Sequence, residues 1–426
     1  MKIYASTAEI ADDIDCLIYS SIFSSDEEVK KICCLKINQL AKEKGIYSAS
    51  IHNLYMAIGN GKVSGFTVPA INIRTLTYDT ARIIFKIALE KHVGVFIFEL
   101  ARSEIDYTAQ RPEEYTCVIL AAALKEGYSG PVFIQGDHFQ FSQSKYAADP
   151  QVEIDKIKKL IKESVDGQFY NIDIDASTLV DLNKQNLLDQ QKANYEMTAL
   201  MSEYIRSLEP KGVTISIGGE IGHIGGKNST VEEFEAFMTG YKQRLENKNI
   251  VGISKVSVQT GTSHGGVPMP DGTIAKIKLD FNVLESIGSV AREKYHIGGS
   301  VQHGASTLPN DLFDTFPKIN TLEIHLATGF QNIVYEHLPR TLRNEMYEWL
   351  KVNCAKERKE DQTEEQFFYT TRKKALGPFK QRLWELSEIE KEPIRTQLYS
   401  QLVFLMEKLH VINTVEVIKN IFNLHE

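Results

Sequence analysis

The chain has 426 residues, of which 42% are hydrophobic and 24% are charged, and its formal net charge is −8. This length suits one large α/β domain with additions, or two ordinary domains. The negative charge offers no general attraction for nucleic acid or an anionic membrane, and no apolar run approaches the roughly 20 residues that cross a bilayer. We therefore expect neither nucleic-acid binding nor a membrane-spanning role.

The first residues and the cysteines predict a cytoplasmic protein. Residues 1–10 lack the uninterrupted apolar segment of a secretory signal. The cysteines are scattered and form no C-x-x-C pair: Cys16, Cys33, Cys34, Cys117 and Cys354. An odd, scattered set of thiols is typical of a reducing compartment, and it favours neither a disulfide framework nor a thiolate zinc site.

Residues 1–60 are predicted to form an N-terminal helical extension. Apolar residues recur at helical spacing over Ile32–Leu40 and Ile51–Ile58. No group of reactive side chains occurs in this segment, so we assign it no chemical role.

From Phe66 onward, short and dense apolar runs alternate with amphipathic stretches. The runs lack a polar alternation, as expected for strands buried on both faces. The eight predicted strands are Phe66–Asn72, Gly94–Leu100, Pro131–Asp137, Gln168–Asp175, Val213–Glu220, Lys255–Gly261, Gly299–Gly304 and Thr321–Ala327. Helical patterns lie between them, for instance at Thr77–Lys91, Pro112–Glu126, Val152–Asp166 and Gln190–Leu208.

Eight strands that alternate with helices match an α/β fold of the (β/α)8 TIM-barrel type, and we assign this barrel to residues 61–340. A doubly wound open sheet is the alternative. The count of eight favours the barrel, and so does the spread of polar residues over several strand ends.

Residues 341–426 are predicted to form a C-terminal helical region. Lys356–Glu365 alternates charges without apolar content and is expected to be a solvated helix or loop. Trp384–Phe422 has amphipathic helical periodicity, so we expect it to pack on the barrel or on a second subunit.

Four predicted strands end in polar side chains beside glycine. Asp137 and His138 end one strand, Glu220 another, and His264 and His303 two more. In a barrel, the C-terminal strand ends surround the active site. Imidazole and carboxylate ligands suit zinc or a similar divalent ion, and three protein ligands leave a position for substrate. Any one of these histidines alone would be explained as a structural residue, but three at three strand ends favour a metal site.

Small residues follow two of the histidines, in His264-Gly265-Gly266 and His303-Gly304-Ala305-Ser306. Such segments leave backbone N–H groups uncovered, and the Ser306 hydroxyl adds a donor, so they can bind an anion. Tight turns that need positive φ are the alternative. Their place beside a predicted metal ligand favours a phosphate or oxyanion site.

Several short motifs occur in a specific order and spacing: Val68-Pro-Ala-Ile-Asn72, Asp137-His138, Ile174-Asp175-Ala176-Ser177, Glu220-Ile-Gly with Gly225-Gly226, Gly261-Thr-Ser-His264-Gly265, His303-Gly304-Ala-Ser306 and Arg372-Lys-Lys-Ala-Leu-Gly-Pro378. Through them the chain, from about Leu54 to Phe379, resembles the class II, metal-dependent fructose-bisphosphate (ketose-bisphosphate) aldolases.

The resemblance implies a catalytic zinc on His138, His264 and His303, with Glu220 as an alternate or distal ligand. Asp137 would protonate or orient the aldehyde oxygen during C–C cleavage. Zinc would polarise the ketone and stabilise the enediolate of dihydroxyacetone phosphate, so that no Schiff-base lysine is needed.

The resemblance also implies a small-molecule partner, a phosphorylated ketose such as fructose 1,6-bisphosphate, and a homodimer or higher homo-oligomer. A monovalent cation, Na⁺ or K⁺, would assist phosphate binding. The residues expected to contact substrate or its phosphates are Asn72, Gly265, Gly304, Ser306, Thr328 and Arg372.

The sequence departs from the family pattern around the substrate. The loop after Gly225-Gly226 normally carries adjacent acids, one of them the proposed base, but Lys227-Asn228-Ser229-Thr230 stands there. Ser229 or Thr230 is expected to cap a helix containing Glu232 and Glu233, which favours a helix-start role for these acids over a role as base. His223 is another candidate proton acceptor.

Two further departures concern the last strand and the loop after His264. The family's Asn-x-Asp-Thr reads His325-Leu-Ala327-Thr328, and the lysine usually found after His-Gly is absent, because Val267-Pro-Met-Pro270 occupies that region. The predicted zinc ligands are thus retained while the residues that read substrate are changed.

Three hypotheses follow. The first is a zinc-dependent aldolase acting on a phosphorylated ketose. The second is a different sugar-phosphate lyase or isomerase on the same scaffold, suggested by His325 and Ala327. The third is a non-catalytic aldolase-like subunit, which the loss of the loop acid favours and the full set of three histidines opposes.

Overall fold

The structure is a computed structural model of the chain, and it describes residues 2–222, 227–261 and 279–424. The predictions for His223, Gly225, Gly226, His264, Gly265 and the segment 267–270 concern positions outside these residues.

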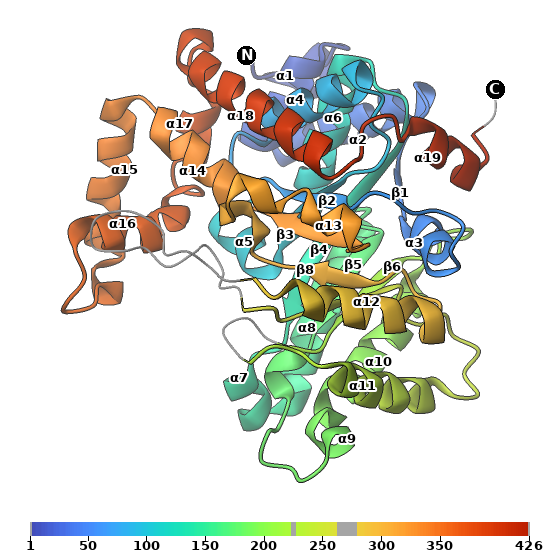
Figure 1. The fold of residues 1–426 in the computed structure, drawn as a ribbon. Helices are drawn as coiled ribbons and strands as arrows, with labels where there is room; N and C mark the ends of the chain where they lie inside the picture. Colours follow the sequence, from blue (N-terminus) through green and yellow to red (C-terminus); the bar gives the residue numbers. More distant parts are fainter. Residues whose placement is uncertain (1, 223–226, 262–278, 425–426) are drawn as a thin grey trace.

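Eight parallel strands form a closed barrel (Figure 1). They are β2 (Val68–Asn72), β3 (Ile97–Ala101), β4 (Gly130–Gln140), β5 (Asn171–Asp175), β6 (Ser216–Glu220), β7 (Lys255–Val258), β8 (Ser300–Gln302) and β9 (Glu323–Leu326). Neighbours along the chain pair in parallel, and β2 also pairs with β9, which closes the ring. Each strand overlaps one predicted strand, so the (β/α)8 barrel is confirmed.

Helices connect successive strands and cover the barrel. The longer ones are α4 (Thr77–Glu90), α6 (Pro112–Glu126), α8 (Pro150–Asp166), α10 (Lys192–Leu208), α11 (Val231–Leu245), α12 (Phe281–Tyr295) and α14 (Thr328–His337). Short helices precede or follow them at α5 (Arg102–Tyr107), α7 (Gln143–Ala148), α9 (Leu187–Gln190) and α13 (Thr315–Lys318). Local sequence determines where α8 begins, because Asp149 accepts hydrogen bonds from two first-turn amides and Pro150 occupies the first helical position.

The first 60 residues are not wholly helical, and here the prediction was incomplete. They contain α1 (Ile14–Phe23), α2 (Glu27–Glu43) and α3 (His52–Gly59), but also a strand, β1 (Ile46–Ala49). β1 pairs in parallel with Gly130–Phe133 at the start of β4, whereas β4 pairs with β5 only from Gln135 onward. A four-residue strand between two helices is too short for its periodicity to be recognised.

The C-terminal region is helical, as predicted. α15 (Arg340–Asn353), α16 (Glu364–Thr371) and α17 (Lys380–Trp384) lie to one side of the barrel in Figure 1. α18 (Glu388–Lys408) contacts α4 and α14, and α19 (Val415–Phe422) contacts α3. Within the described residues no helix has the length and apolar character needed to cross a membrane. All five cysteines are free, as the spacing predicted.

His52, the first residue of α3, gives a pH-dependent contribution to stability. Burial, and to a smaller extent the charge of Arg206, lowers the pKa of His52 from 6.5 to about 4. The unfolded chain therefore binds a proton at His52 between these pH values while the folded chain does not, so stability falls as pH decreases. Between pH 7.5 and pH 5 we expect His52 to remove about 2 kcal/mol from the free energy of unfolding. Urea denaturation of the wild type and His52→Asn at both pH values measures this difference; equal pH dependence in the two proteins would contradict it.

Candidate active site

A bulge at the end of β4 brings Asp137 and His138 into the barrel mouth. The pairing of β4 with β5 shifts between Gly136 and Phe139, and His138 has φ 43°, in the left-handed region that non-glycine residues rarely adopt. Glycine is required at position 136, because a Cβ there would lie 2.5 Å from the ring of Phe139. Strained backbone of this kind is commonly retained at functional sites.

The two described histidines predicted as metal ligands lie side by side. The ring centroids of His138 and His303 are 4.2 Å apart. His303 Nε2 lies 3.1 Å from Ser257 Oγ and 3.9 Å from Asp137 Oδ1. His138 Nδ1 lies 3.3 Å from Glu220 Oε2. The structure thus brings together Asp137, His138, Glu220 and His303 from the ends of three strands.

This donor set fits a divalent metal. Ligand atoms of Asp137, His138 and His303 lie within 4.8 Å of one another, as do those of His138, Asp175 and Glu220. Imidazole nitrogen and carboxylate oxygen are the ligands that zinc and similar ions take in proteins. His138 and His303 would hold such an ion, while Glu220 groups with His138 and Asp175.

The electrostatics of this cluster favour a positive charge. Burial, helped by the neighbouring Asp175 carboxylate, raises the pKa of Glu220 to about 8. Burial alone would lower the pKa of His138, but the carboxylates of Asp137 and Glu220 hold it well above its ordinary value. Burial would likewise raise the pKa of Asp137, yet His138 and His325 hold it well below the usual range.

Asp175 orients His138. Its Oδ2 lies 3.1 Å from His138 Nδ1, and the same carboxylate accepts hydrogen bonds from Gln140 and from Ser177. Burial would raise the pKa of Asp175, but the hydrogen bond with His138 contributes most to holding it below its usual value. A carboxylate that binds one nitrogen of a ligand histidine directs the other nitrogen to the metal. The sequence placed Asp175 in a motif without this role.

We expect Asp175→Asn to weaken metal binding by about 10- to 100-fold, because the amide cannot hold the His138 proton as the carboxylate does. Titration of the apoprotein with Zn²⁺ against a chromophoric chelator measures the dissociation constant. Asp181→Asn, at an exposed aspartate six residues away, is the control. An affinity within twofold of the wild type would rule out the orienting role.

A second group of charged side chains lies deeper in the barrel and was not predicted. Lys255 Nζ lies 2.6 Å from Glu323 Oε1, 2.9 Å from Asp173 Oδ2 and 2.8 Å from Gln135 Oε1. The Tyr55 hydroxyl donates to the other oxygen of Glu323. The sequence did contain a signal for this group. Gln135, Asp173 and Glu323 each lie two residues before a polar residue of the site on the same strand, and residues two apart on a strand face the same side, here the barrel interior.

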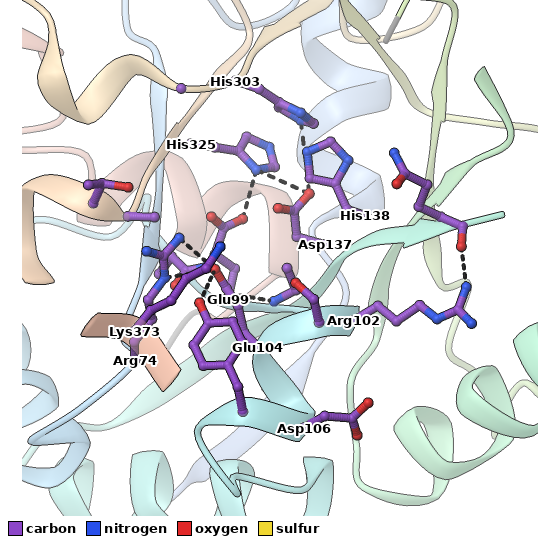
Figure 2. A pocket seen from close by; sticks show the side chains of 18 of the residues that line it. Arg74, Glu99, Arg102, Glu104, Asp106, Asp137, His138, His303, His325 and Lys373 are labelled. Carbon is purple, nitrogen blue, oxygen red and sulfur yellow. Dashed lines mark hydrogen bonds and ion pairs between the residues drawn. The ribbon is translucent and has the colours of Figure 1, made fainter. Parts of the chain in front are cut away.

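His325 connects the two groups. Its ring centroid lies 4.1 Å from that of His303, and its Nδ1 lies 2.9 Å from Glu99 Oε2 and 3.4 Å from Asp137 Oδ1. Its Nε2 lies 2.7 Å from Glu323 Oε1. Figure 2 shows Asp137, His138, His303 and His325 pointing toward one another.

A cavity of about 870 Å³ opens at this end of the barrel. The predicted residues that line it are Asn72, Asp137, His138, His303, Gly304, Ser306 and Thr328. Gly304 has φ 68°, so the tight turn considered as an alternative is present, and the turn still leaves the segment facing the cavity. Ser306 Oγ accepts a hydrogen bond from the Gly329 amide, which leaves its own proton to donate.

Arg372 is not among the described residues that line the cavity. Its guanidinium packs between the rings of Tyr335 and Tyr369, at 5.0 and 4.5 Å from their centroids. The next residue, Lys373, does line the cavity, together with Arg74, whose guanidinium lies 2.7 Å from Glu104. Figure 2 shows Lys373, Arg74 and Glu104 together, apart from His138 and His303.

The acids after residue 230 have the structural role that the sequence predicted. Thr230 caps α11, and Glu233 completes a capping box with it. Glu233 Oε1 also lies 2.6 Å from Lys227 Nζ. Neither Glu232 nor Glu233 lines the cavity.

Comparisons with known proteins agree with this architecture. The family model described as fructose-bisphosphate aldolase class-II matches residues 53–378. No curated protein matches the chain.

Among solved structures, a fructuronate-tagaturonate epimerase from Cohnella laeviribosi is similar, with TM-score 0.58, 11% identity and coverage of 82% of both chains. A probable tagatose 6 phosphate kinase from Sinorhizobium meliloti gives TM-score 0.54 and 13% identity, over 84% of this chain and 99% of the other. A fructose-bisphosphate aldolase from Campylobacter jejuni gives TM-score 0.50 and 16% identity, and the match covers 87% of this chain and 97% of the other. At these identities the likeness concerns the fold.

Proposed function

Because the chain belongs to the class-II fructose-bisphosphate aldolase family, a family of metal-dependent lyases that act on sugar phosphates, we propose that it is a zinc-dependent aldolase. Its substrate would be a phosphorylated ketose such as fructose 1,6-bisphosphate, cleaved to dihydroxyacetone phosphate and an aldehyde. The observation that carries this proposal is the convergence of Asp137, His138 and His303 beside the Gly304–Ser306 turn in one cavity, with Glu220 Oε2 3.3 Å from His138 Nδ1.

The proposed roles of the chain's residues follow from their positions. His138 and His303, with His264, would hold the zinc, and Glu220 would be an alternate ligand. A divalent cation at this position supplies positive charge that polarises a carbonyl group. Asp137, buried beside both histidines, would orient or protonate the aldehyde oxygen.

A phosphate group would bind at the turn after β8. The Gly304 segment and the Ser306 hydroxyl face the cavity, and Thr328 begins α14, so N–H groups of that helix start lie close by. Asn72 would contact the sugar from the end of β2. Arg372 was expected to contact substrate or its phosphates, but Lys373 and Arg74 are the basic residues near it that line the cavity, and they would bind a second phosphate. A Na⁺ or K⁺ ion at the phosphate, a homodimeric or larger assembly and a cytoplasmic location remain part of the proposal.

The direct test is an aldol-cleavage assay. Purified protein is given fructose 1,6-bisphosphate and other ketose phosphates, and triose phosphate is detected by coupled NADH oxidation. We expect activity to disappear after removal of metal with dipicolinate and to return with Zn²⁺. Cleavage that persists without metal would contradict zinc dependence, and absence of cleavage for every ketose phosphate would contradict the aldolase assignment.

A second candidate is an isomerase or epimerase that acts on a related sugar on the same scaffold. His325 and Ala327 stand where the family motif has asparagine and aspartate, and both line the cavity. These changes alter the surface that meets the substrate while the metal-binding histidines are retained. Chromatography of sugar and sugar-acid substrates after incubation discriminates, because this activity gives an isomer without C–C cleavage.

A further inference from the structure

Three ligand atoms converge beside the predicted zinc position, from three different strands. They belong to Glu99 on β3, Asp137 on β4 and His325 on β9, and they lie within 4.8 Å of one another. The three residues are 1%, 5% and 4% exposed. We propose that Glu99, Asp137 and His325 bind a second divalent metal ion, so that the centre holds two ions side by side. This inference deepens the proposed function and rests on it for the first ion only.

The polar atoms of this group lack hydrogen-bond partners. His325 Nδ1 is close to Glu99 and Asp137, but neither contact has the geometry of a hydrogen bond. Nδ1, Asp137 Oδ1 and Glu99 Oε1 are all buried and without a partner in the described part of the chain. Buried polar atoms are nearly always satisfied, so unpaired atoms on three buried side chains whose ligand atoms lie within 4.8 Å of one another indicate a cation position.

Glu323 directs the imidazole of His325. Its Oε1 lies 2.7 Å from Nε2, and Glu323 is itself held by Lys255, Gln135 and Tyr55. Nε2, like Nδ1, has no partner in hydrogen-bond geometry, but Glu323 is its closest carboxylate; a proton on Nε2 would leave Nδ1 with a lone pair toward Glu99 and Asp137. Histidines that bind metals are commonly oriented by a carboxylate at the other ring nitrogen.

The charge of the barrel mouth also favours two cations. Six buried carboxylates lie at the barrel mouth and in the deeper group beneath it, where Lys255 pairs with two of them: Glu99, Asp137, Asp173, Asp175, Glu220 and Glu323. One divalent ion at His138 and His303 leaves an excess of negative charge in an environment that solvates charge poorly. A second ion reduces this excess. A proton on Glu99 or His325 is the competing explanation, and metal stoichiometry separates the two.

The spacing suits a pair of ions. His303 lies between His138 and His325, with ring centroids 4.2 and 4.1 Å away. Asp137 Oδ1 lies 3.9 Å from His303 Nε2 and 3.4 Å from His325 Nδ1, where it can reach both positions. A carboxylate bound to a cation is a poor proton donor, so Asp137 would then orient the aldehyde oxygen and not protonate it.

Metal stoichiometry tests the second site. Full-length protein is saturated with Zn²⁺, dialysed exhaustively against metal-free buffer and analysed by mass spectrometry of the metal. We expect two equivalents per chain in the wild type, and one in His325→Asn and in Glu99→Gln. His52→Asn, a substitution at another buried histidine, is the matched control and should keep two. One equivalent in the wild type, or two retained in both site variants, would overturn the proposal.

Mn²⁺-loaded protein gives a second readout that does not depend on activity. We expect an exchange-coupled electron paramagnetic resonance spectrum in the wild type and the spectrum of isolated Mn²⁺ in His325→Asn. Uncoupled Mn²⁺ in the wild type would contradict adjacent ions. Failure of the two proposals is distinguishable, because one equivalent of zinc with metal-dependent cleavage overturns only the second site. Two coupled ions without cleavage of any ketose phosphate overturn only the aldolase.

Discussion

Replacement of His138 by alanine is expected to abolish catalysis together with zinc binding at the first site, which His138 and His303 form. His138 contributes one of the ligand nitrogens, and its position depends on the bulge at the end of β4 and on Asp175. Loss of a ligand should cost more than the 10- to 100-fold loss seen when a residue that only orients a ligand is removed. We therefore expect activity to fall by more than about 10³-fold, and the zinc bound at the histidines to be lost.

Metal analysis and the cleavage assay on the same preparation check this expectation. His410→Ala, at a half-exposed histidine after α18, is the control and should retain both metal and activity. Thermal unfolding checks that His138→Ala still folds, because alanine adds no bulk but must adopt the positive φ of His138. A variant that keeps its full zinc content would show that His138 is not a ligand. His264→Ala is expected to behave in the same way as His138→Ala.

Asp137→Asn is expected to reduce turnover by about 10²- to 10⁴-fold while zinc stays on the histidines. The amide keeps the shape of the side chain but loses the charge that faces His303 and His325. Because the substrate phosphate is proposed to bind elsewhere, at the Gly304–Ser306 turn, KM should change much less than kcat. Steady-state kinetics measure both constants.

The matched substitution is Asp15→Asn, at a half-buried aspartate on α1 that pairs with Lys125 far from the cavity. It should leave kcat and zinc content unchanged. With two ions bound in the wild type, Asp137→Asn should retain one equivalent. A kcat within threefold of the wild type would exclude Asp137 from the reaction, and complete loss of zinc would make it a ligand of the first ion.

The barrel could be predicted because its strands are buried on both faces and therefore read as uninterrupted apolar runs. β1 could not, since Ile46–Ala49 has four residues, one of them the exposed Tyr47, and it lies between two clear helices. Its role depends on pairing with Gly130–Phe133, more than 80 residues away in the sequence. No local pattern reports such a partner.

Site residues could be predicted where a polar side chain directly follows an apolar run that forms a strand. Asp137-His138 and His303-Gly304 follow apolar runs directly, and the fold then places them together. Asp175 was seen in a motif, but its partner His138 is 37 residues away, so its orienting role needed the structure.

The buried charged residues Lys255 and Glu323 were not predicted, for a different reason. Lys255 and Glu323 each stand alone in an apolar strand, where a single charge carries little information. They neutralise each other only because β7 and β9 both face the barrel interior, 68 residues apart in sequence. Arg372 was assigned to substrate binding by the family resemblance. In the structure its guanidinium packs on the rings of Tyr335 and Tyr369, and Arg372 is not among the described residues that line the cavity.

The strand β1 makes the N-terminal segment part of the folding unit. The family match begins at residue 53, after this strand has ended. A version shortened to that boundary would leave the first residues of β4 with unpaired backbone groups, an open edge of the kind that recruits other chains. It would also remove the backbone of Ile51 and Ala49 from the side chain of Asn171 at the start of β5. A fragment intended to fold on its own, for expression, engineering or fusion, must therefore begin before residue 46.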